Sequence, residues 1–123
     1  MSERRFTPAE ADALLPELRV RLGRIREARR RLIASARVVR ERVIADPGGV
    51  AADPGHFEAA ETLRAELAHL ADLGVVLRDP DAGLVDFPGE VEGRRVWLCW
   101  REGEERVAHY HELDAGFAGR RRL

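Results

Sequence analysis

Residues 96–101 read VWLCWR, and this run decides how the carboxy-terminal part of the chain folds. Successive residues of a strand point to opposite faces of a sheet, so Val96, Leu98 and Trp100 would share one face and the residues between them the other. Three further short strand-like runs, separated by turn segments, lie at 75–77, 84–87 and 106–111. The pattern predicts an antiparallel meander of about four strands followed by a tail, together spanning residues 75–123.

A long amphipathic helix is predicted upstream of this meander, from Thr7 to about Ala45. Thr7 is a suitable N-cap, Pro8 stands at the first helical position, and Glu10 would complete a capping box. An apolar stripe follows in steps of three and four, as in a coiled coil: Leu18, Leu22, Ile25, Leu32, Ala36, Val39 and Val43. Arg29 interrupts it, and its long side chain is expected at the rim.

A second helix is predicted from Asp53, a suitable cap, to Gly74, a suitable stop. Its expected packing face consists of Phe57, Ala60, Leu63, Leu67, Leu70 and Leu73. The predicted fold class is therefore α+β, with a helical hairpin over residues 7–74 and the meander after it. At 123 residues we expect the chain to form a single domain, 1–123.

Composition excludes several kinds of chemistry. All 21 basic side chains are arginine, so Schiff-base chemistry on lysine is excluded. Cys99 is the one cysteine, which rules out a disulfide within the chain and predicts a buried strand thiol. No apolar run approaches the ~20 residues that span a bilayer, so we expect no membrane association and a cytoplasmic location.

Charge is distributed unevenly along the chain. Residues 1–50 carry 12 arginines and 7 acids, a balance of +5, whereas residues 51–123 carry 9 arginines and 15 acids, a balance of −6. We expect the halves to pair within one chain or between two copies, rather than the arginines between Arg19 and Arg42 to bind a polyanion such as nucleic acid. The first helix, on the order of 60 Å long, exceeds what one small domain can cover, which favours a homodimer.

Candidate ligand residues gather near the carboxyl end. His109 and His111 lie two apart on one predicted strand, and with Glu112 they form a candidate site for zinc, iron or manganese. In a metal-dependent hydrolase built on them, Asp86 or Glu104 would be the base. The alternative is a hydrogen-bonded polar cluster that pins the tail to the sheet or binds a small ligand. Its candidate members are Asp86, Glu104, His111, Glu112, Asp114 and Arg120.

Several phrases of the sequence resemble a small bacterial and archaeal family known as domain of unknown function 2203. The phrases are EA at 10–11 with LLP at 14–16, GLVDFP at 83–88, VWLCWREGE at 96–104 and HELDAGFAGR at 111–120. This resemblance extends over nearly the whole chain and implies the order of elements, but it implies no reaction, cofactor or catalytic residue.

Three functions are consistent with these patterns, and whether the chain is an enzyme stays open. The leading hypothesis is a homodimeric binding or scaffold module with a polar cluster at the end of its sheet. A metal-binding protein or metal-dependent hydrolase using His109, His111 and Glu112 is the alternative. Polyanion binding by the arginine-rich first helix is a third possibility, which the net charge of −1 disfavours.

Overall fold

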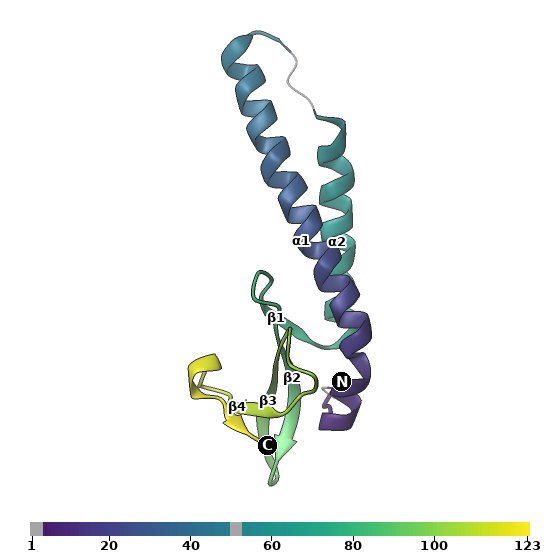
Figure 1. Ribbon diagram of the computed structural model, residues 1–123, viewed down its shortest axis with the longest axis vertical. Coiled ribbons are helices and arrows are strands. Elements are labelled where there is room, and N and C mark those ends of the chain that lie inside the picture. Colours follow the sequence, from purple (N-terminus) through teal and green to yellow (C-terminus); the bar gives the residue numbers. More distant parts are fainter. Residues whose placement is uncertain (1–3, 50–52) are drawn as a thin grey trace.

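The computed structural model, which describes residues 4–49 and 53–123, places a helical hairpin beside an antiparallel sheet (Figure 1). The elements in chain order are α1 Pro8–Ala45, α2 Pro54–Leu73, β1 Val76–Asp79, β2 Leu84–Val91, β3 Arg94–Arg101, β4 His109–Glu112, the short 3-10 helix η1 Phe117–Gly119 and β5 Arg121–Arg122. Neighbouring strands pair in the order β1-β2-β3-β4-β5. The predicted α+β class and the meander are confirmed.

Both predicted helix starts are confirmed by their caps. The Glu10 amide donates to Thr7 Oγ1 at 3.1 Å, and the Thr7 amide donates to Glu10 Oε1 at 2.9 Å, which closes the capping box. Asp53 caps α2 by accepting from the Gly55 amide. Gly74 ends α2 with φ of 84°, in the left-handed region that glycine adopts without strain. The chain then enters β1.

The core lies between the first part of α1 and one face of the sheet, called here the inner face. Strand register places Phe87 opposite Leu98 and Val85 opposite Trp100, and all four side chains are fully buried. They pack with Leu15, Leu18, Leu22 and Ile25 of α1. The predicted alternation of faces in β3 is thus confirmed, because the apolar set points inward and Trp97, Cys99 and Arg101 point to the outer face.

The expected packing face of α2 is partly wrong. Phe57 and Leu67 are 73% and 43% exposed, whereas Ala59 and Glu66 are buried. A single neighbouring helix covers only a narrow stripe of α2, so the wider apolar face read from the sequence is not filled. Two large apolar side chains of α2 are consequently left on the surface.

Several strand boundaries also differ from the prediction, and β2 continues to Val91 rather than ending at Phe87. The fourth strand begins at His109 rather than Arg106, because the segment before it turns inward and the Val107 amide donates to Asp12 Oδ1 of α1 at 2.6 Å. The tail adds a fifth strand, Arg121–Arg122, which pairs with β4. Its two residues are exposed arginines, so the sequence shows no apolar–polar alternation there that would predict a strand. The Leu123 amide donates to the Ala108 carbonyl at 2.8 Å.

Several arginines of α1 pair with acids from the second half of the chain. Arg21 and Arg24 bind Glu66 of α2 at 2.8 and 3.3 Å. Arg26 binds Glu102 at 2.8 Å, and Arg29 binds Asp81 at 2.6 Å. Opposite charges of the two halves therefore meet within one chain along the sheet-proximal part of α1. Polyanion binding by the remaining arginines stays a prediction.

The far half of the hairpin extends beyond the sheet, which lies beside the start of α1 and the end of α2 (Figure 1). Ile33 and Ile44 of this half are 60% and 71% exposed. Across residues 4–49 and 53–123, neither helix combines the length and the apolar character needed to cross a membrane.

Candidate functional site

Three side chains from three neighbouring strands converge on the outer face of the sheet. Asp86 of β2 lies directly opposite Cys99 of β3, and His111 of β4 lies opposite the next outward residue of β3, Trp97. Asp86, Cys99 and His111 are 2%, 0% and 4% exposed. One atom of each, a carboxylate oxygen, the sulfur and a ring nitrogen, lies within 4.8 Å of the other two. We call these three residues the outer-face cluster.

The imidazole of His111 has both nitrogens engaged. Nδ1 lies 2.9 Å from the Glu112 carbonyl oxygen, which can only accept, so Nδ1 carries a proton. Nε2 lies 3.0 Å from Asp86 Oδ2. If Nδ1 holds the proton of a neutral ring, Nε2 presents a lone pair to a carboxylate oxygen, and the two repel unless a cation lies between them. That cation is either a second proton or a metal ion.

The two oxygens of Asp86 are unequally satisfied. Oδ2 also accepts from Arg78 Nε at 2.9 Å. Oδ1 is buried and has no hydrogen-bond partner among the described residues. A buried carboxylate oxygen without a donor is costly, so this atom marks a place where the chain alone leaves the site incomplete.

Cys99 is a buried thiol, as predicted. Burial raises its pKa to about 12, and the charge of Asp86 adds to the shift. At neutral pH the thiol is therefore protonated, which removes the thiolate that nucleophilic catalysis requires. In the chain as it stands, Cys99 is a potential ligand rather than an activated nucleophile.

A cleft of about 430 Å³ opens over the outer-face cluster. The sheet contributes Arg78, Leu84 and the three cluster residues, and the segment after β4 contributes Leu113 to Phe117. We call this hollow the outer-face cleft. The Arg78 side chain is 43% exposed and its guanidinium lies 4.9 Å from the centre of the Trp97 ring.

A second polar group lies at the edge of the same face. Arg120 Nη2 binds both Glu104 Oε2 and His109 Nδ1, and these two atoms are 3.6 Å apart. Arg120 also lies 4.7 Å from the centre of the Phe117 ring. This arrangement fastens the tail to the sheet, the role predicted for the polar cluster, although with His109 in place of His111, Glu112 and Asp114.

The predicted metal ligands are not all brought together. Glu112 lies opposite Val96 on the inner side of the sheet and binds Arg94 at 2.7 Å, away from His111. His109 shares the outer face with His111, but its Nδ1 is engaged by Arg120. Asp114 is exposed and lines the outer-face cleft. Of the predicted residues, Asp86 and His111 meet directly.

Sequence reasoning missed Cys99 and Arg78 as members of this site. Cys99 was assigned to the correct face, but nothing in the sequence shows that Asp86 is its cross-strand partner. Arg78 follows the three-residue apolar run 75–77 and carries no periodic signal. Both residues were missed for the same reason: the register in which strands pair is set by the folded sheet and not by a local sequence pattern.

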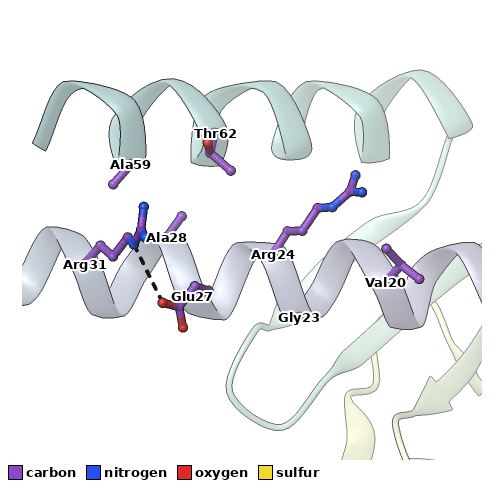
Figure 2. Close-up of a pocket in the computed structure, with 8 residues that line it drawn as sticks. All are labelled: Val20, Gly23, Arg24, Glu27, Ala28, Arg31, Ala59 and Thr62. Atoms are coloured by element: carbon purple, nitrogen blue, oxygen red, sulfur yellow. Dashed lines mark ion pairs between the residues drawn. The ribbon is translucent and has the colours of Figure 1, made fainter. Parts of the chain in front are cut away.

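A groove of about 330 Å³ also runs between the helices (Figure 2). Its lining includes Val20, Gly23 and Ala28 of α1 with Ala59 and Thr62 of α2. The charged residues on its α1 side include Glu27 and Arg31, which pair with each other at 3.7 Å. No group of buried polar side chains converges on this groove in the part of the chain that the structure describes, so the outer-face cleft is the better candidate site.

Comparison with known proteins identifies the family. A family model described as an uncharacterized conserved protein, DUF2203, matches residues 4–123, and the chain therefore belongs to this family. No curated protein and no solved structure matches the chain.

Proposed function

We propose that this DUF2203 protein is a binding module that takes a small organic acid in the outer-face cleft. The observation that carries this proposal is the cleft, whose volume of about 430 Å³ falls within the range of small-molecule sites. Leu84, Leu113 and Phe117 supply apolar lining, and Arg78 supplies a cation. An acid with an apolar body matches both features.

Arg78 is suited to anchor a carboxylate. Its Nε donates to Asp86, and its guanidinium stacks on Trp97, so the side chain is held in position. Neither contact needs its two terminal nitrogens, which have no partner among residues 4–49 and 53–123. A guanidinium fork recognises a carboxylate through two parallel hydrogen bonds. Because the exposed Asp114 would repel a second negative charge, we expect monoacids to bind better than diacids.

Binding is favoured over catalysis by the state of Cys99. The raised pKa of this thiol, about 12, keeps it protonated at neutral pH. An enzyme that used it as nucleophile would need a base or a positive environment that lowers the pKa instead. The proposal therefore treats the cleft as a ligand site without assigning a reaction.

Titration with hexanoate tests the proposal, with Trp97 fluorescence as the signal. Saturable change is expected with hexanoate, and none with hexanol, which has the same apolar body without the charge. Arg78→Gln should abolish the response, whereas Arg94→Gln, whose side chain binds Glu112, should keep it. Trp97→Phe identifies the signal, since Trp100 is fully buried on the inner face. An equal response to hexanol, or a response retained without Arg78, would refute the acid ligand.

A homodimeric scaffold is the second candidate function, favoured by the far half of the hairpin. Val43, Ile44 and Phe57 are 47%, 71% and 73% exposed there. Helix α1 carries ten arginines against five acids, and α2 carries one arginine against four acids. Two hairpins that place α1 of one chain against α2 of the other would cover these apolar residues and join opposite charges.

Light scattering coupled to gel filtration tests this dimer at micromolar concentration. A mass of twice 13.8 kDa is expected for the wild type, and Ile44→Glu should convert it to a monomer. Leu113→Glu provides the control, since it adds the same charge at an exposed residue outside the two helices. A monomeric wild type would refute the scaffold while leaving the cleft proposal intact.

A further inference from the structure

We propose that the outer-face cluster, Asp86, Cys99 and His111, binds a divalent transition-metal ion of the zinc type. This inference does not depend on the proposed acid ligand, because it rests on the three donor residues and the contacts that orient them, and not on what the cleft binds. The donor set differs from the one predicted from sequence, since Cys99 and Asp86 replace His109 and Glu112.

The donors are held by three different strands. Asp86, Cys99 and His111 belong to β2, β3 and β4, whose pairing fixes the backbone at each position. Their ligand atoms lie within 4.8 Å of one another, whereas ligands of a tetrahedral zinc ion are separated by about 3.3–3.8 Å. Closing that difference takes a movement of about 1 Å, which side-chain rotation supplies without a change in the sheet.

Two electron-rich atoms of the cluster lack a positive partner among residues 4–49 and 53–123. Asp86 is only 2% exposed, and its Oδ1 has no hydrogen-bond donor in that part of the chain. His111 Nε2 faces Asp86 Oδ2 at 3.0 Å while Nδ1 is committed to a carbonyl. A second proton on the imidazole would satisfy Nε2 and leave Oδ1 unpaired. A metal ion at this place satisfies both residues and takes the sulfur as its third ligand.

The surroundings orient the donors as they do in known metal sites. A ligating histidine commonly donates its other ring N–H to a carbonyl or carboxylate, which fixes the tautomer and leaves one nitrogen free for the metal. The Glu112 carbonyl does this for His111. Arg78 fixes the Asp86 carboxylate in the same way through Oδ2. Both contacts are already present in the structure.

The ligand types select the metal. One nitrogen, one sulfur and one oxygen ligand suit Zn²⁺ or Co²⁺, whereas Mg²⁺ and Ca²⁺ require oxygen. On binding, Cys99 loses its proton to solvent and coordinates as thiolate, and His111 binds through its Nε2 lone pair. Three protein ligands leave a fourth position for water or for an external ligand. That position faces the outer-face cleft, where the cluster lines the floor.

Cobalt titration of metal-free, tag-free protein tests the site. We expect one Co²⁺ per chain, a thiolate-to-cobalt charge-transfer band in the near ultraviolet, and displacement of cobalt by zinc. Cys99→Ser should remove the band, and His111→Ala should weaken cobalt binding about 100-fold or more, beyond the effect of changing groups that only orient ligands. Circular dichroism shows whether each variant keeps its fold.

His109→Ala separates the two donor sets. It should leave cobalt binding unchanged if Cys99, Asp86 and His111 are the ligands, and abolish it if the predicted set of His109, His111 and Glu112 is correct. His69→Ala, an exposed histidine of α2, is the control for histidine loss in general. Failure of the wild type to retain stoichiometric cobalt, or a charge-transfer band that survives Cys99→Ser, would overturn the proposal.

Discussion

Two buried carboxylates, Glu66 in the hairpin and Asp86 in the sheet, are treated very differently by the fold. Glu66 Oε2 accepts from Arg21 at 2.8 Å, and Oε1 accepts from Arg24 at 3.3 Å. Asp86 meets Arg78 and His111 through Oδ2, and its Oδ1 has no hydrogen-bond partner among the described residues. The side chains are 8% and 2% exposed, so burial alone does not explain the contrast.

The contrast separates a structural ion pair from a site. Burial raises the pKa of Glu66, but the hydrogen bonds and charges of Arg21 and Arg24 outweigh it and the pKa is lowered overall. Both oxygens of this carboxylate accept hydrogen bonds from arginines of α1, so Glu66 links α2 to α1. Among the described residues, only one of the two Asp86 oxygens has hydrogen-bond partners, and the carboxylate lies beside the Cys99 thiol and the His111 imidazole. A group left incomplete by its own chain is a better guide to function than burial or charge.

The largest expected effect that distinguishes the two carboxylates is metal stabilisation. With free Zn²⁺ at a thousand times Kd, the free energy of unfolding should rise by ~4 kcal/mol, since the ion binds only the folded chain. Glu66→Gln should keep this increment, and Asp86→Asn should lose it. Urea denaturation with and without zinc measures both. An increment that Asp86→Asn retains would contradict the assignment of Asp86 as a ligand.

In the absence of metal, substitution of Glu66 should destabilise the protein more than substitution of Asp86. Glu66→Ala should lower the free energy of unfolding by about 1.5–3 kcal/mol, because it removes charge-assisted hydrogen bonds from two arginines. Asp86→Asn should cost less than about 1 kcal/mol, because it removes a charge whose second oxygen is unpaired while keeping the shape of the side chain. Equal losses in the two variants would show that Asp86 is as fully satisfied as Glu66.

Acid should weaken the Glu66 link in a defined direction. The folded pKa of Glu66 is lowered, so its contribution is fully present above the ordinary glutamate pKa of about 4.3 and is lost as pH falls through the lower folded value. The difference in unfolding free energy between wild type and Glu66→Gln should therefore shrink below that pH. A difference that stays constant or grows in acid would contradict this sign.

The smallest effect is expected at an exposed carboxylate of the same helix. Glu61 binds Arg64 at 2.8 Å, but the two side chains are 47% and 70% exposed. Water screens such a pair, so Glu61→Ala should leave the denaturation midpoint unchanged. A clear loss at Glu61 would mean that helix α2 depends on its charges in general, and the Glu66 result would then carry less weight.

Local signals were enough to predict the helices and the character of the sheet faces. The capping box of Thr7 and Glu10, the Asp53 cap and the stop at Gly74 each involve residues within a few positions of one another. The alternation in β3 likewise follows from the geometry of an extended chain. Such features are recorded in the sequence because the atoms that make them are neighbours along it.

Features that depend on distant partners were predicted less well. Phe57 and Leu67 are exposed because, in the part of the chain that the structure describes, α1 covers only the stripe of α2 that faces it. His109 and Glu112, although close to His111 in sequence, have other partners: Arg120 binds His109, and Arg94 binds Glu112. Strand pairing, not spacing along the chain, decides which residues share a site.

The sequence by itself determined the α+β class, the ends of both helices, the two faces of β3 and the presence of Asp86 and His111 among the candidate residues. Only the tertiary structure decided that Asp86 lies opposite Cys99 and that His111 reaches the same point from β4. The reason is physical. Helix caps and strand alternation are local consequences of backbone geometry, whereas a site made by three strands exists only once their register is fixed by packing against α1.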